Sequence, residues 1–398
     1  MIKKNALFLA ITATLAAQAH AGGIILHEVA TFDSVSSAGV GNTTNRKDAS
    51  AAITNPAGLT AIEDSSWSFG LQVVDAKTVL SGTASVEGVG AINLDSEGTT
   101  TALAPSIAYA KRFTDNLVLG ASLHADGGLG MEYDNGLSGY GFVDSQSQEF
   151  LNVNLAAGYS VNSRWAVGGA LVIQHMMTTM DIDRSLNVSD VIDANLKASG
   201  EDGTTSASFM LSTMYDINDR TYISANYKHK VEHSDASLTL KGTANGQPVT
   251  VPADISVNWP SQLSVGIQHQ LDHALTLKGM VGAEFWSDYS KELKTEDVYT
   301  IGTAIEYQHN AWTYQAGARY DTSFMKDKNL TPQLAVGDNW AVGFGAELQR
   351  SNGHRIGIAY QYRDMSTADT THELFGAPIF DGSIKENRLH ALSLSYAY

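Results

Sequence analysis

Apolar and polar residues alternate along the chain from about residue 65 to the last residue. Between 340 and 348, one face consists of Trp340, Val342, Phe344, Ala346 and Leu348, and the other of Ala341, Gly343, Gly345 and Glu347. The same pattern recurs in 151–160 and in 312–320. Alternation with a period of two predicts β-strands with one apolar and one polar face. A soluble β-sandwich would alternate as well, so the pattern predicts an all-β fold without deciding its class.

The joins between the predicted strands are short and long in turn. Six are tight and polar, at 112–116, 161–164, 217–220, 270–274, 308–311 and 350–353. Longer joins are expected at 81–98, 133–147, 187–200, 241–253, 287–296, 325–335 and 368–384. Outer-membrane barrels have short periplasmic turns, longer external loops and, in bacteria, an even number of strands. We therefore predict a transmembrane antiparallel β-barrel of about fourteen strands over residues 65–398.

Aromatic residues near the predicted strand ends favour a membrane barrel over a soluble all-β protein. Such barrels carry aromatic girdles at both membrane interfaces. The candidates are Trp165, Tyr215, Tyr227, Trp259, Trp286, Tyr307, Trp312 and Tyr362. The final strand, LHALSLSYAY, ends on Tyr398, which resembles the C-terminal signal of outer-membrane barrels.

The N-terminus has the layout of a secretory signal peptide. Lys3 and Lys4 precede an apolar run from Ala6 to Ala17, and small residues follow at Ala19 and Ala21. We expect cleavage after Ala21, with Ala19 as the alternative, so that residues 1–21 are removed. No later stretch has 18 consecutive apolar residues, so no membrane helix is expected. The predicted location is the outer membrane of a Gram-negative bacterium.

Composition and motifs exclude several function classes. The 25 Lys and Arg against 42 Asp and Glu give a net charge of −17, which argues against nucleic acid as a partner. The chain has no cysteine, hence no disulfide framework. His229 and His233 would lie about 13 Å apart on a strand, so we expect them to be solvated rather than to bind metal. We find no nucleophile or phosphate-binding motif, and expect neither enzyme activity nor a cofactor.

Residues 22–64 lack the alternation and are the candidate for a plug. A barrel of this width cannot fill its lumen with its own side chains, so it is either an open channel or plugged. The segment is rich in Ser, Thr, Asn, Ala and Gly and ends in the turn Asn55, Pro56, Ala57. The alternative is a flexible N-terminal arm.

Several motifs together resemble the outer-membrane transporters of long-chain fatty acids and aromatic hydrocarbons, the FadL/TodX-like family. They are GGIILHE, SSAGVGNTT and NPAGL near the mature N-terminus, NLAAGYSVNSRWAVGGALV, and ARYDTSFMKDKNLTPQLAVGDNWAVGFGAEL. The resemblance covers residues 22–398 and implies a fourteen-stranded barrel with an N-terminal hatch.

The resemblance also implies a mechanism and partners. A hydrophobic small molecule such as a fatty acid would be captured at the external loops, bind in the lumen and leave sideways through a kinked third strand. The other partners would be outer-membrane lipid, lipopolysaccharide and the barrel-assembly machinery, and the protein would be a monomer. The chain is shorter than typical fatty-acid members and its loops at 187–200 and 241–253 are brief, so the substrate could be smaller or its capture weaker.

Ligand-binding residues are implied by the same resemblance. Arg184 corresponds to a basic residue that holds the fatty-acid carboxylate; the alternative is a lumen-facing arginine paired with wall carboxylates. A second basic residue falls at Lys294 or Lys291, where a solvated loop lysine is the alternative. Ile24, Ile25 and Leu26 would project from the hatch toward the pocket, and three exposed apolar residues in a row need a burial site.

The stretch HADGGLGMEY on the third predicted strand is the candidate for the kink. Asp126, Gly127, Gly128 and Gly130 fall where the family interrupts its wall, and glycine permits a bulge and leaves space beside it. The alternative is ordinary glycine use in a barrel. Two other functions stay open: a general porin, and a surface adhesin or phage receptor that acts through its loops.

Overall fold

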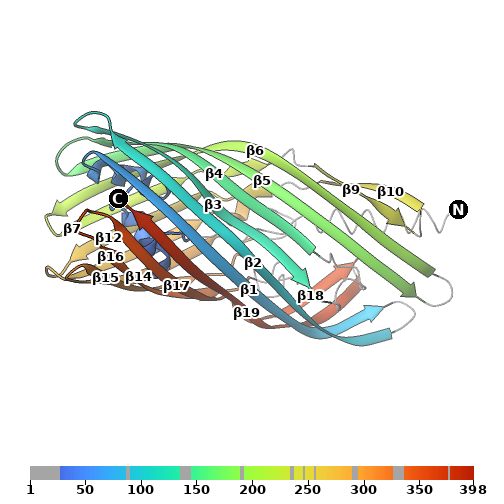
Figure 1. Cartoon of the computed structure of the whole chain (residues 1–398). Coiled ribbons are helices and arrows are strands. Elements are labelled where there is room, and N and C mark those ends of the chain that lie inside the picture. Colours follow the sequence, from blue (N-terminus) through green and yellow to red (C-terminus); the bar gives the residue numbers. More distant parts are fainter. Residues whose placement is uncertain are drawn as a thin grey trace.

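Strands dominate the computed structural model, which describes residues 27–86, 90–134, 145–188, 192–233, 237–244, 247–254, 257–288, 295–325, 336–374 and 377–398. In this described part, fourteen strands form a closed antiparallel barrel (Figure 1). They are β1 (Ser65–Val86), β2 (Gly90–Arg112), β3 (Leu117–Tyr133), β4 (Ser145–Ser160), β5 (Trp165–Val188), β6 (Ile192–Asn218), β7 (Thr221–Lys228), β12 (Gln262–Gln270), β13 (Leu275–Glu284), β14 (Val298–His309), β15 (Trp312–Asp321), β16 (Asn339–Gln349), β17 (Arg355–Asp364) and β19 (Ala377–Ala397). Pairing of β1 with β19 closes the barrel.

The alternation predicted from the sequence matches the two faces of the wall. In β4, Leu151, Val153 and Leu155 are exposed on the outside, whereas Asn152 and Asn154 are buried inside. The outer faces of β16 and β19 likewise expose Phe344 and Leu394. An apolar outer belt with a polar interior is the arrangement that a lipid environment requires of a barrel. None of the helices in the described part is long and apolar enough to cross a membrane.

All six predicted short turns are present, but several predicted long loops are not loops. The ladder of β1 with β2 continues to the pair Val86 and Gly90, through the segment 81–98. The ladder of β5 with β6 likewise continues to Val188 and Ile192, through 187–200. The segment 241–253 lies largely in a hairpin of β9 (Ser237–Ala244) and β10 (Gln247–Asp254), and β18 (Asp369–Leu374) pairs with β19. These stretches lack the long, regular alternation of the other strands, so the sequence pattern alone does not identify them as strands.

Residues 27–64, called the hatch segment below, lie inside the barrel at the end that carries the short turns and the C-terminus (Figure 1). The hatch segment contains four short helices, α2 (Phe32–Ser36), η1 (Val40–Thr44), α3 (Ala51–Thr54) and η2 (Pro56–Ala61). Thr31 caps α2 by accepting a hydrogen bond from the backbone N–H of Ser34. Of residues 27–62, only Ala61 is exposed. The segment is therefore packed against the inner wall along most of its length.

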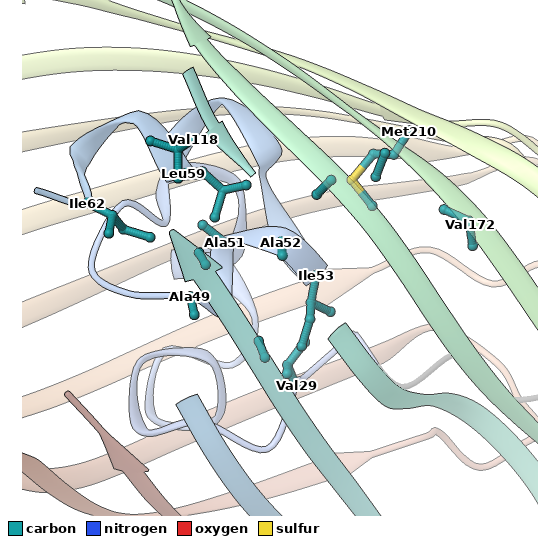
Figure 2. Packing of buried hydrophobic residues seen from close by; sticks show 14 residues of the cluster. Val29, Ala49, Ala51, Ala52, Ile53, Leu59, Ile62, Val118, Val172 and Met210 are labelled. Carbon is teal, nitrogen blue, oxygen red and sulfur yellow. The ribbon is translucent and has the colours of Figure 1, made fainter. Parts of the chain in front are cut away.

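One apolar cluster joins the hatch segment to the barrel wall. Ala52, Ile53 and Leu59 of the hatch segment pack with Val118 of β3 and Met210 of β6 (Figure 2). Wall glycines make room for this close contact. A Cβ on Gly168 of β5 would lie 2.2 Å from the backbone nitrogen of Ala57. The glycine content of the inner wall is therefore partly explained by the backbone that lies against it.

Candidate functional site: a break in the barrel wall

The barrel wall is interrupted between β2 and β3. Regular pairing runs up to Ser106 with His124 and resumes only at Thr99 with Glu132. Residues 100–105 of β2 and 125–131 of β3 therefore have no partners in each other. On its other edge β3 stays paired with β4 through this stretch, apart from a bulge between Ala125 and Gly127. One strand thus separates from one neighbour while it remains attached to the other.

The predicted kink residues lie within this break. Asp126 is the extra residue of the bulge, and Gly127 has a φ of 152°, which side-chain-bearing residues rarely adopt. A Cβ on Gly128 would lie 2.9 Å from the carbonyl oxygen of Gln148 on β4. Gly130 pairs with Ser147. The glycines therefore allow β3 to bend and to pack closely on β4.

Asp126 is held by side chains from across the lumen. It forms an ion pair with Lys228 at the end of β7 and accepts a hydrogen bond of 3.1 Å from Nε2 of Gln174 on β5. His124 lies nearby, with its Nε2 3.9 Å from Oδ1 of Asp126. Asp126 and Lys228 are only 9% and 7% exposed, so each charge needs the other. This polar cluster was not predicted from the sequence.

A cavity of about 120 Å³ lies between the break and the hatch segment. Its lining includes His124, Ala125, Asp126 and Lys228 near the break, and Val29 and Ile53 from the hatch segment. Met210 and Met280 add flexible apolar surface. Most of the lining residues are polar or charged, and the apolar part consists of Val29, Ile53, Ala125, Met210 and Met280.

Buried aromatic rings line the interior beyond this cavity. Phe150 of β4 packs on Trp259 with ring centroids 4.4 Å apart, Trp259 lies 6.5 Å from Trp286, and Trp286 lies 5.5 Å from Phe324. Trp259 belongs to β11 (Val257–Trp259), which pairs with β8 (Val231–His233), and Trp286 to η5 (Trp286–Asp288). Placing these two tryptophans in an outer girdle was wrong, because their segments leave the wall. Trp165, Tyr215, Tyr307 and Trp312 are exposed as predicted.

The prediction that His233 is solvated was also wrong. Its side chain is 1% exposed, and its Nε2 lies 3.0 Å from Oε1 of Gln174. His229 instead stacks on Phe209 with centroids 4.8 Å apart. Across the described residues, no three His, Asp or Glu side chains are grouped to hold a metal ion.

Buried charges attach one side of the hatch segment to the wall. Glu28 lies 3.0 Å from Arg363 of β17 and 3.4 Å from Arg319 of β15. Burial alone would raise the pKa of the Glu28 carboxyl, but Arg363 and Arg319 outweigh it and hold that pKa below its ordinary range. His27 extends the group by pairing with Glu284.

A second charged group lies further along the hatch segment. Asp33 pairs with Lys47, at 2.9 Å, and with Lys278 of β13. Although burial opposes it, these two lysines lower the pKa of Asp33. Arg355 of β17 pairs with Asp48 at 2.6 Å. Such pairs lose stability sharply when one partner is removed, because the other charge stays buried.

The Asn55, Pro56, Ala57 motif docks on the opposite wall. Nδ2 of Asn55 donates to Oγ of Ser224 on β7 at 2.7 Å, and the backbone N–H of Ala57 donates to Oγ of Ser212 on β6 at 2.8 Å. Pro56 begins η2, where its missing N–H costs nothing. The motif therefore fixes the end of the hatch segment before the chain enters β1.

For the remaining predicted ligand residues, the structure gives little or no information on side-chain contacts. Arg184 lies in β5, and its backbone pairs with Leu196 of β6. Ile24, Ile25, Leu26, Lys291 and Lys294 lie outside the described residues. Lys228, Gln174 and Arg319 were missed; Arg319 has inward parity on a clear strand, which is a usable signal, whereas Lys228 lies at a strand end.

Comparisons with known proteins agree with this architecture. Residues 12–373 match the family described as outer membrane protein transport protein (OMPP1/FadL/TodX). The long-chain fatty acid transport protein of Escherichia coli K12 is 21% identical over 423 positions, covering 91% of this chain and 92% of that protein.

Two solved structures share the fold. A Pseudomonas aeruginosa FadL homologue has a TM-score of 0.80 at 16% identity, over 95% of this chain and 99% of that one. The Pseudomonas putida toluene transporter TodX has a TM-score of 0.64 at 15% identity, over 94% and 99%.

Proposed function

The chain belongs to the outer membrane protein transport protein family (OMPP1/FadL/TodX), and on this premise we propose that it imports hydrophobic small molecules by lateral exit through the break between β2 and β3. It is an outer-membrane transport protein and not an enzyme. In this proposal the substrate enters from the side of the long hairpins, binds in the lumen and leaves into the membrane.

The observation that carries the proposal is the position of the break. The cavity behind it is lined by His124, Ala125 and Asp126 of the same strand stretch that loses its pairing with β2. A ligand there would need to pass only one layer of wall to reach lipid. The opposite direction is occupied by the hatch segment, which we propose acts as a plug.

Lateral exit suits a hydrophobic substrate on energetic grounds. Transfer of an apolar chain into water costs about 0.8 kcal/mol for each CH₂ group. A route from the binding site directly into the bilayer keeps the chain out of periplasmic water and avoids this cost, which would otherwise grow with chain length. No ATP or ion coupling is needed, because the lipid phase accepts the substrate.

The substrate class is proposed from the relatives and the aromatic interior. The Escherichia coli relative is named for long-chain fatty acids and the Pseudomonas putida structure for toluene. The packed rings of Phe150, Trp259 and Trp286 give part of the interior an apolar, aromatic character, although each is at most 4% exposed. Arg184, Lys294 and the apolar residues Ile24, Ile25 and Leu26 remain proposed ligand contacts.

Replacing Gly127, Gly128 and Gly130 by valine tests the proposal. The added side chains should obstruct the break and reduce uptake of radiolabelled oleate and toluene about tenfold in host cells that lack their own transporter. Ala121→Val, on the exposed face of the same strand, is the control and should leave uptake unchanged. Normal uptake by a correctly assembled triple variant would exclude the break as the exit; a general porin would instead show high conductance for hydrophilic solutes.

A further inference from the structure

Asp126 is connected to strands that are not neighbours of β3. The wall runs in the order β3, β4, β5, β6, β7. The contact with Gln174 therefore passes over β4, and the ion pair with Lys228 passes over three strands. The bulge residue is thus tied to the far side of this arc of wall, and its carboxylate is directed into the barrel.

We propose that Lys228 and Gln174 are positioning residues that hold β3 away from β2 and so keep the break open. The importance of these two residues for transport rests on the proposed lateral exit, but their effect on the distance between β2 and β3 can be measured without any transport.

We call the contacts of Asp126 with Lys228 and Gln174 the strut. A strut is needed because the backbones of β2 and β3 are unpaired with each other in the break. Residues 100–105 and 125–131 would gain strand hydrogen bonds if β3 moved outward onto β2. That movement would separate the buried Asp126 carboxylate from Lys228. Each buried charge would then be uncompensated, and this penalty opposes closure of the wall.

Both partners of Asp126 are themselves fixed. The backbone of Lys228 pairs with Met210 on β6 and with Gln262 on β12, so its side chain extends from a position held on both sides. His233 orients the Gln174 amide: Nε2 of His233 contacts Oε1 of Gln174, and Nε2 of Gln174 donates to Asp126. Because the backbone of Lys228 and the amide of Gln174 are both fixed, their contacts with Asp126 can hold β3 away from β2.

Disulfide trapping tests the strut directly, since the native chain contains no cysteine. Thr101→Cys with Gly130→Cys continues the register of the pair Thr99 and Glu132 into the break. Ile107→Cys with Leu123→Cys, two residues that face each other in the intact ladder, is the matched control. Oxidation of the purified full chain in detergent reports how often β2 and β3 meet.

The decisive background is Asp126→Asn with Lys228→Met, which removes both charges and leaves no buried charge unpaired. In this background, disulfide formation between positions 101 and 130 should be about fivefold or more higher than in the same cysteine pair with Asp126 and Lys228 intact. Gln174→Leu should raise it to a smaller degree. The control pair should crosslink equally in every background, which shows that the barrel is assembled. Unchanged trapping in the break, with a normal control, would overturn the strut whether or not lateral exit is correct.

Discussion

Glu28 illustrates how single buried charges hold the hatch segment in place. Its carboxylate is buried between Arg319 and Arg363, and its pKa lies below the ordinary range despite burial. A group whose folded pKa is depressed stabilises the folded state above its unfolded pKa, and this contribution is lost as pH falls through the folded value. Attachment of the hatch segment should therefore be constant from neutral pH down to about 5 and weaken in more acidic solution.

Single-channel conductance in planar bilayers measures this attachment, since a displaced hatch segment opens the lumen. We expect low conductance at neutral pH and rising open probability below about pH 4. Glu28→Gln should open already at neutral pH, with a loss of about 3 kcal/mol in the free energy that holds the segment. Glu63→Gln, at an exposed residue, is the control. A Glu28→Gln protein that conducts like the native one at all pH values would contradict this role.

Such contacts mark the limit of prediction at the residue scale. Inward parity could place Arg319 in the lumen, but its partner Glu28 is 291 positions away in the chain. Nor could the pairing of Asp126 with Lys228 be predicted, because it depends on how far β3 bends and where β7 ends. The glycines at 127, 128 and 130 were a usable local signal, because their backbone freedom is a property of the residue itself.

At the scale of elements, alternation predicted the membrane strands and failed where they leave the membrane. Leu155 and Asn154 occupy opposite faces as expected, because lipid and lumen impose opposite demands on neighbouring residues. The continued ladders of β1 with β2 and of β5 with β6 lack sustained alternation, so their sequences do not carry this signal. Trp259 and Trp286 were misplaced for a related reason: their segments turn into the barrel, where no regular period applies.

Docking of the hatch segment against the wall gives a prediction at this scale. A Cβ on Gly168 would meet the backbone nitrogen of Ala57 at 2.2 Å, whereas on Gly169 the nearest atom, the carbonyl oxygen of Met210, is at 3.3 Å. Gly168→Ala should therefore displace the start of η2 and lower the thermal unfolding temperature by several degrees, about what a loss of 1–2 kcal/mol produces.

The matched control is Gly169→Ala, one position away on the same strand, which should unfold close to the native temperature. Equal unfolding temperatures for the two variants would show that the hatch segment does not depend on this close contact.

The whole molecule combines three features: a break in the wall, a cavity behind it and a hatch segment paired with the wall through buried charges. Strand periodicity, join lengths and family resemblance were enough to predict the fourteen-stranded barrel. They also predicted that the hatch segment lies at the N-terminal end of the chain. The substrate was not, because the cavity is assembled from residues of the hatch segment and of strands far apart in sequence, such as Ile53, His124 and Met280.

The central claim is that substrate leaves through the break between β2 and β3, and reversible closure of that break tests it most directly. In cells expressing the Thr101→Cys and Gly130→Cys protein, we would compare uptake of radiolabelled oleate before oxidation, after oxidation and after reduction, with the Ile107→Cys and Leu123→Cys protein in parallel. The account predicts that uptake falls about tenfold on oxidation of the break pair and returns on reduction, while the control pair has no effect. Undiminished uptake through a barrel whose break is quantitatively crosslinked would contradict it.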